Sequence, residues 1–573
     1  MASGSVHGRL ESFSRKILSF ATGSASLVLA AAILNAAVPE WSFGQATSTW
    51  VRYDQHGRLQ YATDPQGNRI MDYSTAGYEG GGVALPHVPA RATVKPSGGD
   101  DTAAIQAAID TVSALSPDPC GFRGAVLLAS GNFNVSATLN ITSSGVVLAG
   151  SGSDANGTII TMTGSPFTLI SVSGSGSLTQ GSPVAITDPY VPSGAESFHV
   201  SDASGFKPGD AVVVRRPVTA PWIAFMGMDK LVRNGAPETW IAPGSVILTD
   251  RTIRRVAGNE ITLDAPVTDS FDSQYLNPPG GSIATYTFPG RISQVGIEHL
   301  SIVAPAQEVS GTQYEAVEVN NIQNAWLRDL NIHDTQNSIV LNARTKAMTL
   351  EGVNVIHSYA QSNAAAPFDF SLSGTQVLVD RCSVTGHGNT WPFAPQSRLA
   401  GPIVVLNSTA DDRGFDPHQR WATGLLCDLC NFPNSHTADK AGVSYSNRGY
   451  FGSGHGWDAG WSVAWNVTTT YFLIQAPPGV DNWCIGCIGT VLSEAAPGGD
   501  GTILPNGIFD SLGTAVTPGS LYLAQLKQRL GPQALHRIGY ADVNGTPLPA
   551  CSHRHSEDSH QPSHDHDGEC DDD

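Results

Sequence analysis

A short three-residue pattern recurs between Val295 and Thr490: an apolar residue, then usually Asn or Ser, then a small or apolar residue. It returns eight times, at intervals of 30, 23, 29, 24, 24, 35 and 22 residues between middle positions. A period in the twenties, with short β-rich runs and no long amphipathic helix, is typical of a solenoid whose repeats stack on one another. The sequence therefore predicts a parallel β-helix built on these triplets: Leu300-Ser301-Ile302, Leu330-Asn331-Ile332, Val353-Asn354-Val355, Cys382-Ser383-Val384, Leu406-Asn407-Ser408, Cys430-Asn431-Phe432, Trp465-Asn466-Val467 and Cys487-Ile488-Gly489.

The middle residues of the triplets predict a polar ladder along one corner of the coils. An Asn amide can bond to the next amide along a stack, and Asn tolerates the unusual backbone of a turn. The alternative is chance Asn in surface loops, since turns favour Asn in any case. The ladder would consist of Asn331, Asn354, Asn407, Asn431 and Asn466.

Composition limits the classes of protein that fit. Only 14% of the 573 residues are charged, while 61 Gly and 36 Pro supply many turns, as in an exported all-β protein. The formal net charge is −19 and the chain stays acidic without its acidic C-terminus. An acidic body does not attract nucleic acid or anionic membranes over long range. We therefore expect no nucleic acid partner and no membrane partner after signal cleavage.

The two ends of the chain differ from its body. Three basic residues precede the apolar run from Ile17 to Val38, and small residues follow at 44–46, which predicts a secretory signal peptide over residues 1–46. An uncleaved membrane anchor is the alternative, because the run is long enough to span. Either predicts a secreted, periplasmic or extracellular body. Five His and eight acidic residues at 551–573 predict a disordered tail.

The segment after residue 98 predicts a helix that opens the coils. Asp stands at its start, and Ile105, Ile109, Val112 and Leu115 fall on one face. Three β-rich runs follow, each opening with Gly, at positions 124, 131 and 145. This order resembles the pectate-lyase superfamily of right-handed parallel β-helix proteins. The resemblance implies a fold that serves lyases, hydrolases, epimerases and phage tailspikes, so it does not fix the reaction.

We therefore expect an all-β chain folded as a right-handed parallel β-helix, with an N-terminal cap helix, a small inserted β module and a C-terminal capping helix. Trp222, Met226, Met228 and Trp240 would form the core of the inserted module, or alternatively a sugar-stacking surface. The C-terminal helix would begin at Ser520 and cover the open end of the solenoid. The expected parts are 47–180 (cap and first coils), 181–290 (inserted module), 291–495 (coils with catalytic-face loops) and 496–550 (C-terminal cap).

Two Cys-x-x-Cys pairs look at first like a zinc site. In register, however, Cys430 and Cys487 occupy equivalent positions with one coil between them, so they stand roughly 10 Å apart. Neither a single zinc ion nor a disulfide can join pairs at that distance. We expect buried thiols or bonds within each pair, Cys427 with Cys430 and Cys484 with Cys487.

Two long loops, 409–424 and 433–460, concentrate His, Arg and aromatic residues and predict a glycan cleft. The alternative is that these side chains brace the loops. His333 and His357 would emerge on the same side of the coils. The candidate catalytic residues are His418, Arg420, His436, Lys440, Tyr445, Arg448 and His455, and the candidate substrate-binding residues are His387, Trp421 and Trp457.

These residue types suit a lyase that cleaves a uronic-acid polymer by β-elimination. The reaction needs a cation on the carboxylate, a base for the neighbouring proton and a donor for the leaving oxygen. Arg420, or second Arg448, suits the first role because its fork binds carboxylate in two contacts. The base would be His436, His455 or Lys440, and the donor Tyr445 or His418. The superfamily resemblance also implies calcium, for which Asp411, Asp412 and Asp416 could supply oxygens.

Two other functions stay open. Polygalacturonases carry an Asp pair followed by Gly-His-Gly, and here Asp411-Asp412 precedes Gly454-His455-Gly456, although their other two motifs are not found. Such an inverting glycoside hydrolase would use two carboxylates as acid and base, with Asp458 a further candidate. The third possibility is a non-catalytic carbohydrate-binding surface protein. In each case the expected partner is a polysaccharide, acidic for the lyase, and the chain is a monomer or an oligomer of unknown size.

Overall fold

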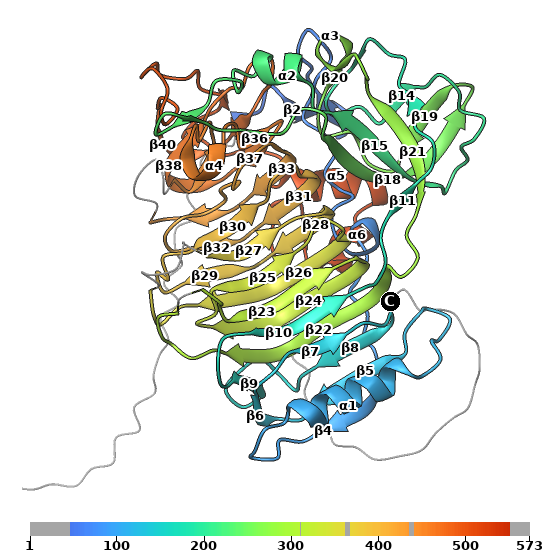
Figure 1. Ribbon diagram of the computed structural model, residues 1–573, viewed down its shortest axis with the longest axis vertical. Coiled ribbons are helices and arrows are strands. Elements are labelled where there is room, and N and C mark those ends of the chain that lie inside the picture. The colour runs from blue at the N-terminus through green and yellow to red at the C-terminus, as the bar shows by residue number, and fades with distance from the viewer. Residues whose placement is uncertain (1–45, 310, 361–366, 435–440, 550–573) are drawn as a thin grey trace, which may run out of the picture. The chain divides into compact units, whose positions relative to one another are not determined.

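Parallel strands that stack coil on coil make up most of the chain (Figure 1). The computed structural model describes residues 46–309, 311–360, 367–434 and 441–549. The predicted signal peptide and acidic tail lie outside these residues. No helix in the described part of the chain is long and apolar enough to cross a membrane.

The coils present three parallel sheets. Sheet 1 runs in the order β30-β27-β25-β23-β10-β7. Sheets 2 and 3 share the long strands β22 (Ile292–Val303), β24 (Ile322–His333) and β26 (Lys346–Ile356), each of which contributes to both. The strands of sheet 1 are β7 (Leu139–Ile141), β10 (Thr168–Ser173), β23 (Glu315–Asn320), β25 (Asn337–Leu341), β27 (Phe368–Leu372) and β30 (Trp391–Pro395).

Shorter strands continue sheets 2 and 3 on either side of the three long strands. The others in sheet 2 are β4 (Ala90–Val94), β5 (Gly124–Leu128), β8 (Val146–Ala149), β28 (Thr375–Asp380), β31 (Ala400–Leu406), β33 (Ala422–Asp428), β36 (Ala459–Gly460), β37 (Val463–Trp465), β39 (Trp483–Ile485) and β41 (Ile508–Asp510). The others in sheet 3 are β6 (Gly131–Val135), β9 (Thr158–Met162), β29 (Ser383–Thr385), β32 (Thr409–Ala410), β34 (Asn431–Phe432), β38 (Thr468–Ile474) and β40 (Ile488–Val491).

The core is a set of apolar columns that run from coil to coil. Ile297, Leu327 and Leu350 are paired in register on neighbouring strands, and Val379 and Val405 continue the same column. All five side chains are at most 1% exposed. Each coil therefore buries its apolar residues against the coils above and below, as the repeat predicts.

The polar ladder exists, but the residues predicted for it belong to two different columns of the coils. The true ladder passes from Asn354 to Ser383 and then to Thr409, so Asn407 is not part of it. Asn407 and Asn466 lie two positions earlier, in a turn column whose residues have positive φ. Asn is one of the few residues that enter that backbone region readily, which explains why both columns attract it.

Asn354 is the best-connected rung of the ladder. Its amide donates to Asn331 Oδ1 at 3.0 Å and its own Oδ1 accepts from Ser383 Oγ at 2.8 Å. We expect Asn354→Ala to lower the free energy of unfolding by about 1 to 2 kcal/mol, since two part-buried bonds are lost. Urea denaturation of this variant beside Asn132→Ala, which removes one exposed bond to Thr161, would measure it. Equal losses in both variants would contradict a structural ladder.

Residues 179–287 form antiparallel strands beside the coils (Figure 1). Four of their large side chains are buried: Trp222, Met226, Met228 and Trp240. The prediction that they form a core is confirmed, and the alternative of a sugar-stacking surface is wrong. The elements are β11 (Thr179–Gln180), β12 (Val184–Ala185), β13 (Tyr190–Val191), β14 (Ser197–His199), β15 (Ala211–Pro217), α2 (Ala220–Phe225), β16 (Val232–Arg233), β17 (Ala236–Pro237), β18 (Val246–Ala257), β19 (Glu260–Leu263), β20 (Phe271–Asp272), α3 (Ser273–Leu276) and β21 (Ser282–Thr287).

Helix α1 (Thr102–Ser113) packs against the first strands of the coils, with Ile105, Ile109 and Val112 buried. Leu115, predicted on the same face, is 39% exposed because the helix ends before it. Before this helix lie β1 (Ala46–Thr47), β2 (Val51–Tyr53), β3 (Leu59–Tyr61) and the 3-10 turn η1 (Tyr78–Gly80).

The C-terminal helix α5 (Leu521–Leu530) begins after Ser520, whose hydroxyl accepts from the Leu523 N–H, as the sequence predicts. It is followed by α6 (Gln533–Arg537), and β42 (Val516–Thr517) precedes it. Ser520 Oγ and the Tyr522 N–H donate to Asp428, and Tyr540 donates to Asp380. Because Asp428 and Asp380 belong to β33 and β28, the segment lies along the side of sheet 2 rather than over its last coil.

Asp428 makes this docking sensitive to pH. Burial raises the pKa of the Asp428 carboxyl to about 7. The folded state therefore holds a proton that the unfolded chain releases, so this stabilisation is complete at low pH and is lost as pH rises through 7. Between pH 5 and 8.5 we expect the free energy of unfolding of the wild type to fall by about 3 kcal/mol relative to that of Asp428→Asn, measured by urea denaturation. Parallel pH profiles of the two proteins would contradict this.

The cysteine prediction is confirmed in its main points. Cys484 and Cys487 form a disulfide, while Cys382, Cys427 and Cys430 are buried free thiols. Cys427 pairs with Ala464, which pairs with Cys484, so one coil separates the two Cys-x-x-Cys pairs.

Candidate active site

A cavity of about 320 Å³ opens on the outer face of the last coils, where sheet 1 is continued by Phe415, β35 (Val443–Tyr445) and β38. Phe415, Val443 and Phe472 stack in register and point into the core. The residues after them, Asp416, Ser444 and Leu473, therefore face outward into the cavity. Its walls are Trp391, Asp416, Ser444, Ser446, Asn447, Arg448, Phe451, Leu473, Gln475, Glu494, Ala495 and Pro497.

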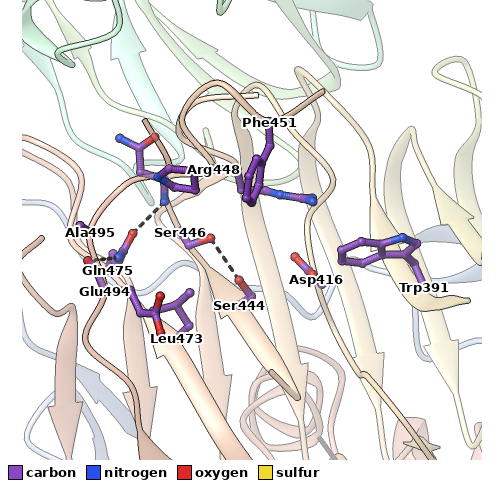
Figure 2. A pocket seen from close by; sticks show the side chains of 12 residues that line it. Trp391, Asp416, Ser444, Ser446, Arg448, Phe451, Leu473, Gln475, Glu494 and Ala495 are labelled. Atoms are coloured by element: carbon purple, nitrogen blue, oxygen red, sulfur yellow. Dashed lines mark hydrogen bonds between the residues drawn. The ribbon is translucent and has the colours of Figure 1, made fainter. Parts of the chain in front are cut away.

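Carboxylates stand on two sides of this cavity (Figure 2). Asp416 lies beside Trp391, and Glu494 lies on the other side with Gln475 and Leu473. Behind Asp416 is Asp458, which is fully buried and accepts from the Ser446 N–H at 2.7 Å and from Ser446 Oγ at 3.1 Å. Burial raises the pKa of Asp458 well above its ordinary value, and the charge of Asp416 raises it further. Asp416 and Asp458 thus form a carboxyl pair that favours holding one proton.

A cation and an aromatic ring form the wall next to Asp416. The guanidinium of Arg448 lies over the Trp391 ring at 4.9 Å and donates to the His418 carbonyl at 2.7 Å. Arg413 lies over the same ring at 3.8 Å. The stacking fixes the planar guanidinium of Arg448 at the cavity, where its remaining N–H groups can meet an oxyanion.

The polar wall is held in place by hydrogen bonds between and within coils. The Asn447 N–H donates to Gln475 Oε1 at 2.8 Å, and the Ser444 and Ser446 hydroxyls are 3.1 Å apart (Figure 2). Gly449 allows the loop after Asn447 to approach the next loop closely. A Cβ there would lie 1.9 Å from the Pro497 carbonyl oxygen.

His418 and His455 lie beyond Arg448, with ring centroids 4.9 Å apart. Burial lowers the pKa of His418 to about 4, and the nearby Arg448 adds to the effect. Burial, followed by Arg448, lowers the pKa of His455 to about 3. Both rings are neutral at neutral pH, and neither lines the cavity. A histidine with so low a pKa is a weak base, which removes support for His455 as the proton acceptor.

Three predicted site residues belong to the core instead. Tyr445 is fully buried among the coils and donates to the Val463 carbonyl, so it does not reach the cavity as an acid. Trp421 is 1% exposed and donates to Asp269 Oδ2 at 2.7 Å, and Trp457 donates to the Met226 carbonyl. The antiparallel strands and loops of residues 179–287 cover both indoles, which the sequence placed in a substrate cleft.

The remaining candidates are dispersed. His387 is exposed and lies outside the cavity lining, as does His333. His357 is buried and bonds to Asp369 at 3.0 Å. Arg420 donates to Ser453 and Gln419 and does not line the cavity. His436 and Lys440 lie outside the described residues.

The three Asp residues named for calcium do not form one ligand set. Asp411 accepts from the Gly386 N–H, whereas Asp416 faces the cavity. No group of three or more His, Cys, Asp or Glu side chains that could hold a metal is present in the described ranges. The residues present therefore do not fit the calcium that the superfamily resemblance implies.

Sequence reasoning predicted Arg448 as a catalytic residue and Asp416 only as a calcium ligand. It did not predict Trp391 or Glu494. These residues stand about a hundred positions apart. Counting register from the apolar column that contains Phe393 and Phe415, rather than from the Asn triplets, would have pointed to Asp416 and the strand of Trp391. No sequence signal singles out Glu494.

No family model matches the chain, and no curated protein matches it. Among solved structures, the Gp54 tailspike of Acinetobacter baumannii bacteriophage AP22, in complex with A. baumannii capsular saccharide, is similar with 11% identity and a TM-score of 0.35 over 68% of this chain. The tailspike gp49 of Pseudomonas phage LKA1 is 14% identical, with a TM-score of 0.38 over 68% of this chain. The catalytic domain of GH87 alpha-1,3-glucanase, in complex with nigerose, is 8% identical, with a TM-score of 0.30 over 77% of this chain.

The chain spans 51% and 57% of the two tailspike chains and 68% of the glucanase chain. These likenesses are too weak to carry an argument about activity, and the resemblance to the pectate-lyase superfamily stays a prediction.

Proposed function

We propose that this protein is an exported polysaccharide-cleaving enzyme and that the cavity of Asp416 and Glu494 is its active site, acting by hydrolysis. The observation that carries this proposal is the Asp416 carboxyl at the cavity with buried Asp458 behind it. Across the cavity stands Glu494, which is exposed. Two carboxyl groups in different environments are what acid and base catalysis of glycoside hydrolysis requires.

The roles follow from the surroundings of each group. Asp416 is the general acid, because it is the member of the carboxyl pair that faces the cavity and can pass on the proton that the pair holds. Its proton passes to the glycosidic oxygen as the bond from that oxygen to the anomeric carbon breaks. Glu494 takes a proton from the water whose oxygen attacks the same carbon, which inverts its configuration. Trp391 offers a ring face to a sugar, and Arg448, Asn447 and Gln475 offer polar contacts.

Elimination is the second candidate, and Arg448 is the observation that favours it. Its guanidinium stands at the cavity on the Trp391 ring, where it could bind the carboxylate of a uronic acid. Of the residues predicted as base and donor, His418, Tyr445 and His455 do not line the cavity, and His436 and Lys440 lie outside the described residues. For this reason we place hydrolysis first.

A panel of neutral and acidic polysaccharides, assayed for new reducing ends and for ultraviolet absorbance of unsaturated products, tests the proposal. New reducing ends without absorbance support hydrolysis. Absorbance that rises with the reducing ends establishes elimination instead. Binding of a polymer without either product would overturn the proposal in favour of a carbohydrate-binding surface protein.

A further inference from the structure

The junction cavity, a second cavity of about 240 Å³, lies between the antiparallel strands and the coils. One wall is β18, with Val246, Leu248 and Asp250. The opposite wall consists of three successive coil turns, at residues 343–345, 373–375 and 397–400. This cavity shares no lining residue with the proposed active site.

Cations outnumber carboxylates at this cavity. Asp250 is the one carboxylate in its lining, and it already binds Arg291 Nη1 at 3.0 Å and Lys346 Nζ at 2.9 Å. Arg344 and Arg398 also line the cavity, and their side chains form no hydrogen bond or ion pair with any described residue. In a chain whose formal charge is −19, two such arginines beside a satisfied carboxylate create a local positive site.

The walls of this cavity are held firmly. Arg251, fully buried beneath it, donates from β18 to Thr375 Oγ1 at 2.8 Å and to the Gly401 carbonyl at 2.7 Å. The Tyr286 hydroxyl bonds to both oxygens of Asp250 at 3.0 Å. The backbone turns and the Asp250 wall are therefore in place before an anion binds, and the Arg344 and Arg398 side chains stay free to reach it.

The positive charge continues toward the active site along neighbouring turns. The Arg398 N–H donates to the Arg420 carbonyl, and the Arg420 N–H donates to the His455 carbonyl, so these turns stack coil on coil. Burial lowers the pKa of Arg420, and the nearby Arg398 lowers it further. Arg448 follows, with its side chain on the His418 carbonyl of the same turn region. Arg344, Arg398, Arg420 and Arg448 form an arginine row from the junction cavity to the active-site cavity.

We propose that the junction cavity is an anion-binding subsite that takes a carboxylate or sulfate group of the polymer, while a neighbouring part of that polymer occupies the active-site cavity. The substrate class is therefore a polyanionic glycan, a conclusion that rests on the proposed function. Arg344 and Arg398 make the charge-assisted contacts.

Binding is tested apart from cleavage by isothermal titration of full-length protein carrying Asp416→Asn, so that the ligand stays intact. The probes are a galacturonic acid hexasaccharide, the neutral maltohexaose and inorganic sulfate. In this background we expect Arg344→Ala and Arg398→Ala each to weaken binding of the acidic hexasaccharide on the order of 10- to 100-fold, as loss of a charge-assisted bond predicts. Arg255→Ala is the matched control, since that arginine is 64% exposed on β18 and pairs with Glu260.

The arms of this experiment separate the two proposals. Acidic hexasaccharide binding that the two arginine variants leave unchanged would overturn the subsite. Binding of sulfate alone, lost in both variants, would assign the pocket to a free small anion and overturn the polymer. Loss of hexasaccharide binding in both variants, with the Arg255→Ala control intact, supports the subsite even if no polymer is ever cleaved by the wild type.

Discussion

Asp416→Asn is expected to lower turnover of the cleavable polysaccharide about 1,000-fold, since removal of a general acid or base costs two to four orders of magnitude. The amide keeps the shape of the side chain at the cavity but cannot deliver the proton. The bound polymer should still be held by the remaining walls, so KM should change little compared with kcat. Initial rates of reducing-end release across a substrate series would measure both constants.

Asp500→Asn is the matched control for this prediction. Asp500 is exposed, follows Glu494 in the same loop and accepts from the Thr502 N–H. Its substitution should leave kcat within about twofold, as for most surface changes. An Asp416→Asn enzyme that is folded, by circular dichroism, and retains more than a tenth of the wild-type kcat would sink the assignment of this residue. Glu494→Gln should show a comparable loss of kcat as the missing base.

Arg251→Met should lower the free energy of unfolding by about 4 kcal/mol, which is typical when one partner of a buried charged network is removed. Arg251 donates to the Asp250, Ala265, Pro266 and Gly401 carbonyls and to Thr375 Oγ1, and it is completely buried. Met fills much of the same volume but donates to none of these acceptors, of which the Gly401 carbonyl keeps the Thr375 hydroxyl as a donor. Because two of the acceptors belong to the coils, docking of the antiparallel strands should weaken most.

Urea denaturation followed by tryptophan fluorescence is the measurement, because Trp222 and Trp240 report from the antiparallel part and Trp326 from the coils. Arg254→Met serves as control, since Arg254 is 60% exposed and pairs with Glu196 at the surface. That change should cost under about 1 kcal/mol. Equal stability of the two variants would show that the buried guanidinium contributes nothing to docking.

The repeat determined the fold class without help from tertiary information. A period in the twenties with alternating apolar residues can bury its core only by stacking coils, and the observed columns, such as Ile297 beneath Leu327, follow from that requirement. The prediction that the two Cys-x-x-Cys pairs lie too far apart to be joined depends on the same stacking. Once the register is known, the distance between Cys427 and Cys484 is set by the strand spacing alone.

Register within a coil was less secure, because two columns two residues apart both favour Asn. Asn354 and Asn431 both belong to the ladder, with Ser383 and Thr409 between them, whereas Asn407 occupies the positive-φ turn. A side-chain amide serves both places, one through hydrogen bonds and the other through backbone tolerance. Residue type alone could not separate them. The loops 409–424 and 433–460, in which the sequence predicts the cleft, nevertheless supply six of the twelve residues that line the cavity.

Only the tertiary structure decided which polar and aromatic residues meet. Trp421 and Trp457 look like sugar platforms in sequence, but residues 179–287 dock over them and turn them into core. Asp416 and Glu494 come together because the coils between them are stacked, a proximity that no local spacing encodes. Periodicity determines the strands and core positions that all coils share. The site instead depends on individual loops and on the docked strands, whose positions are set by packing between segments far apart in the sequence.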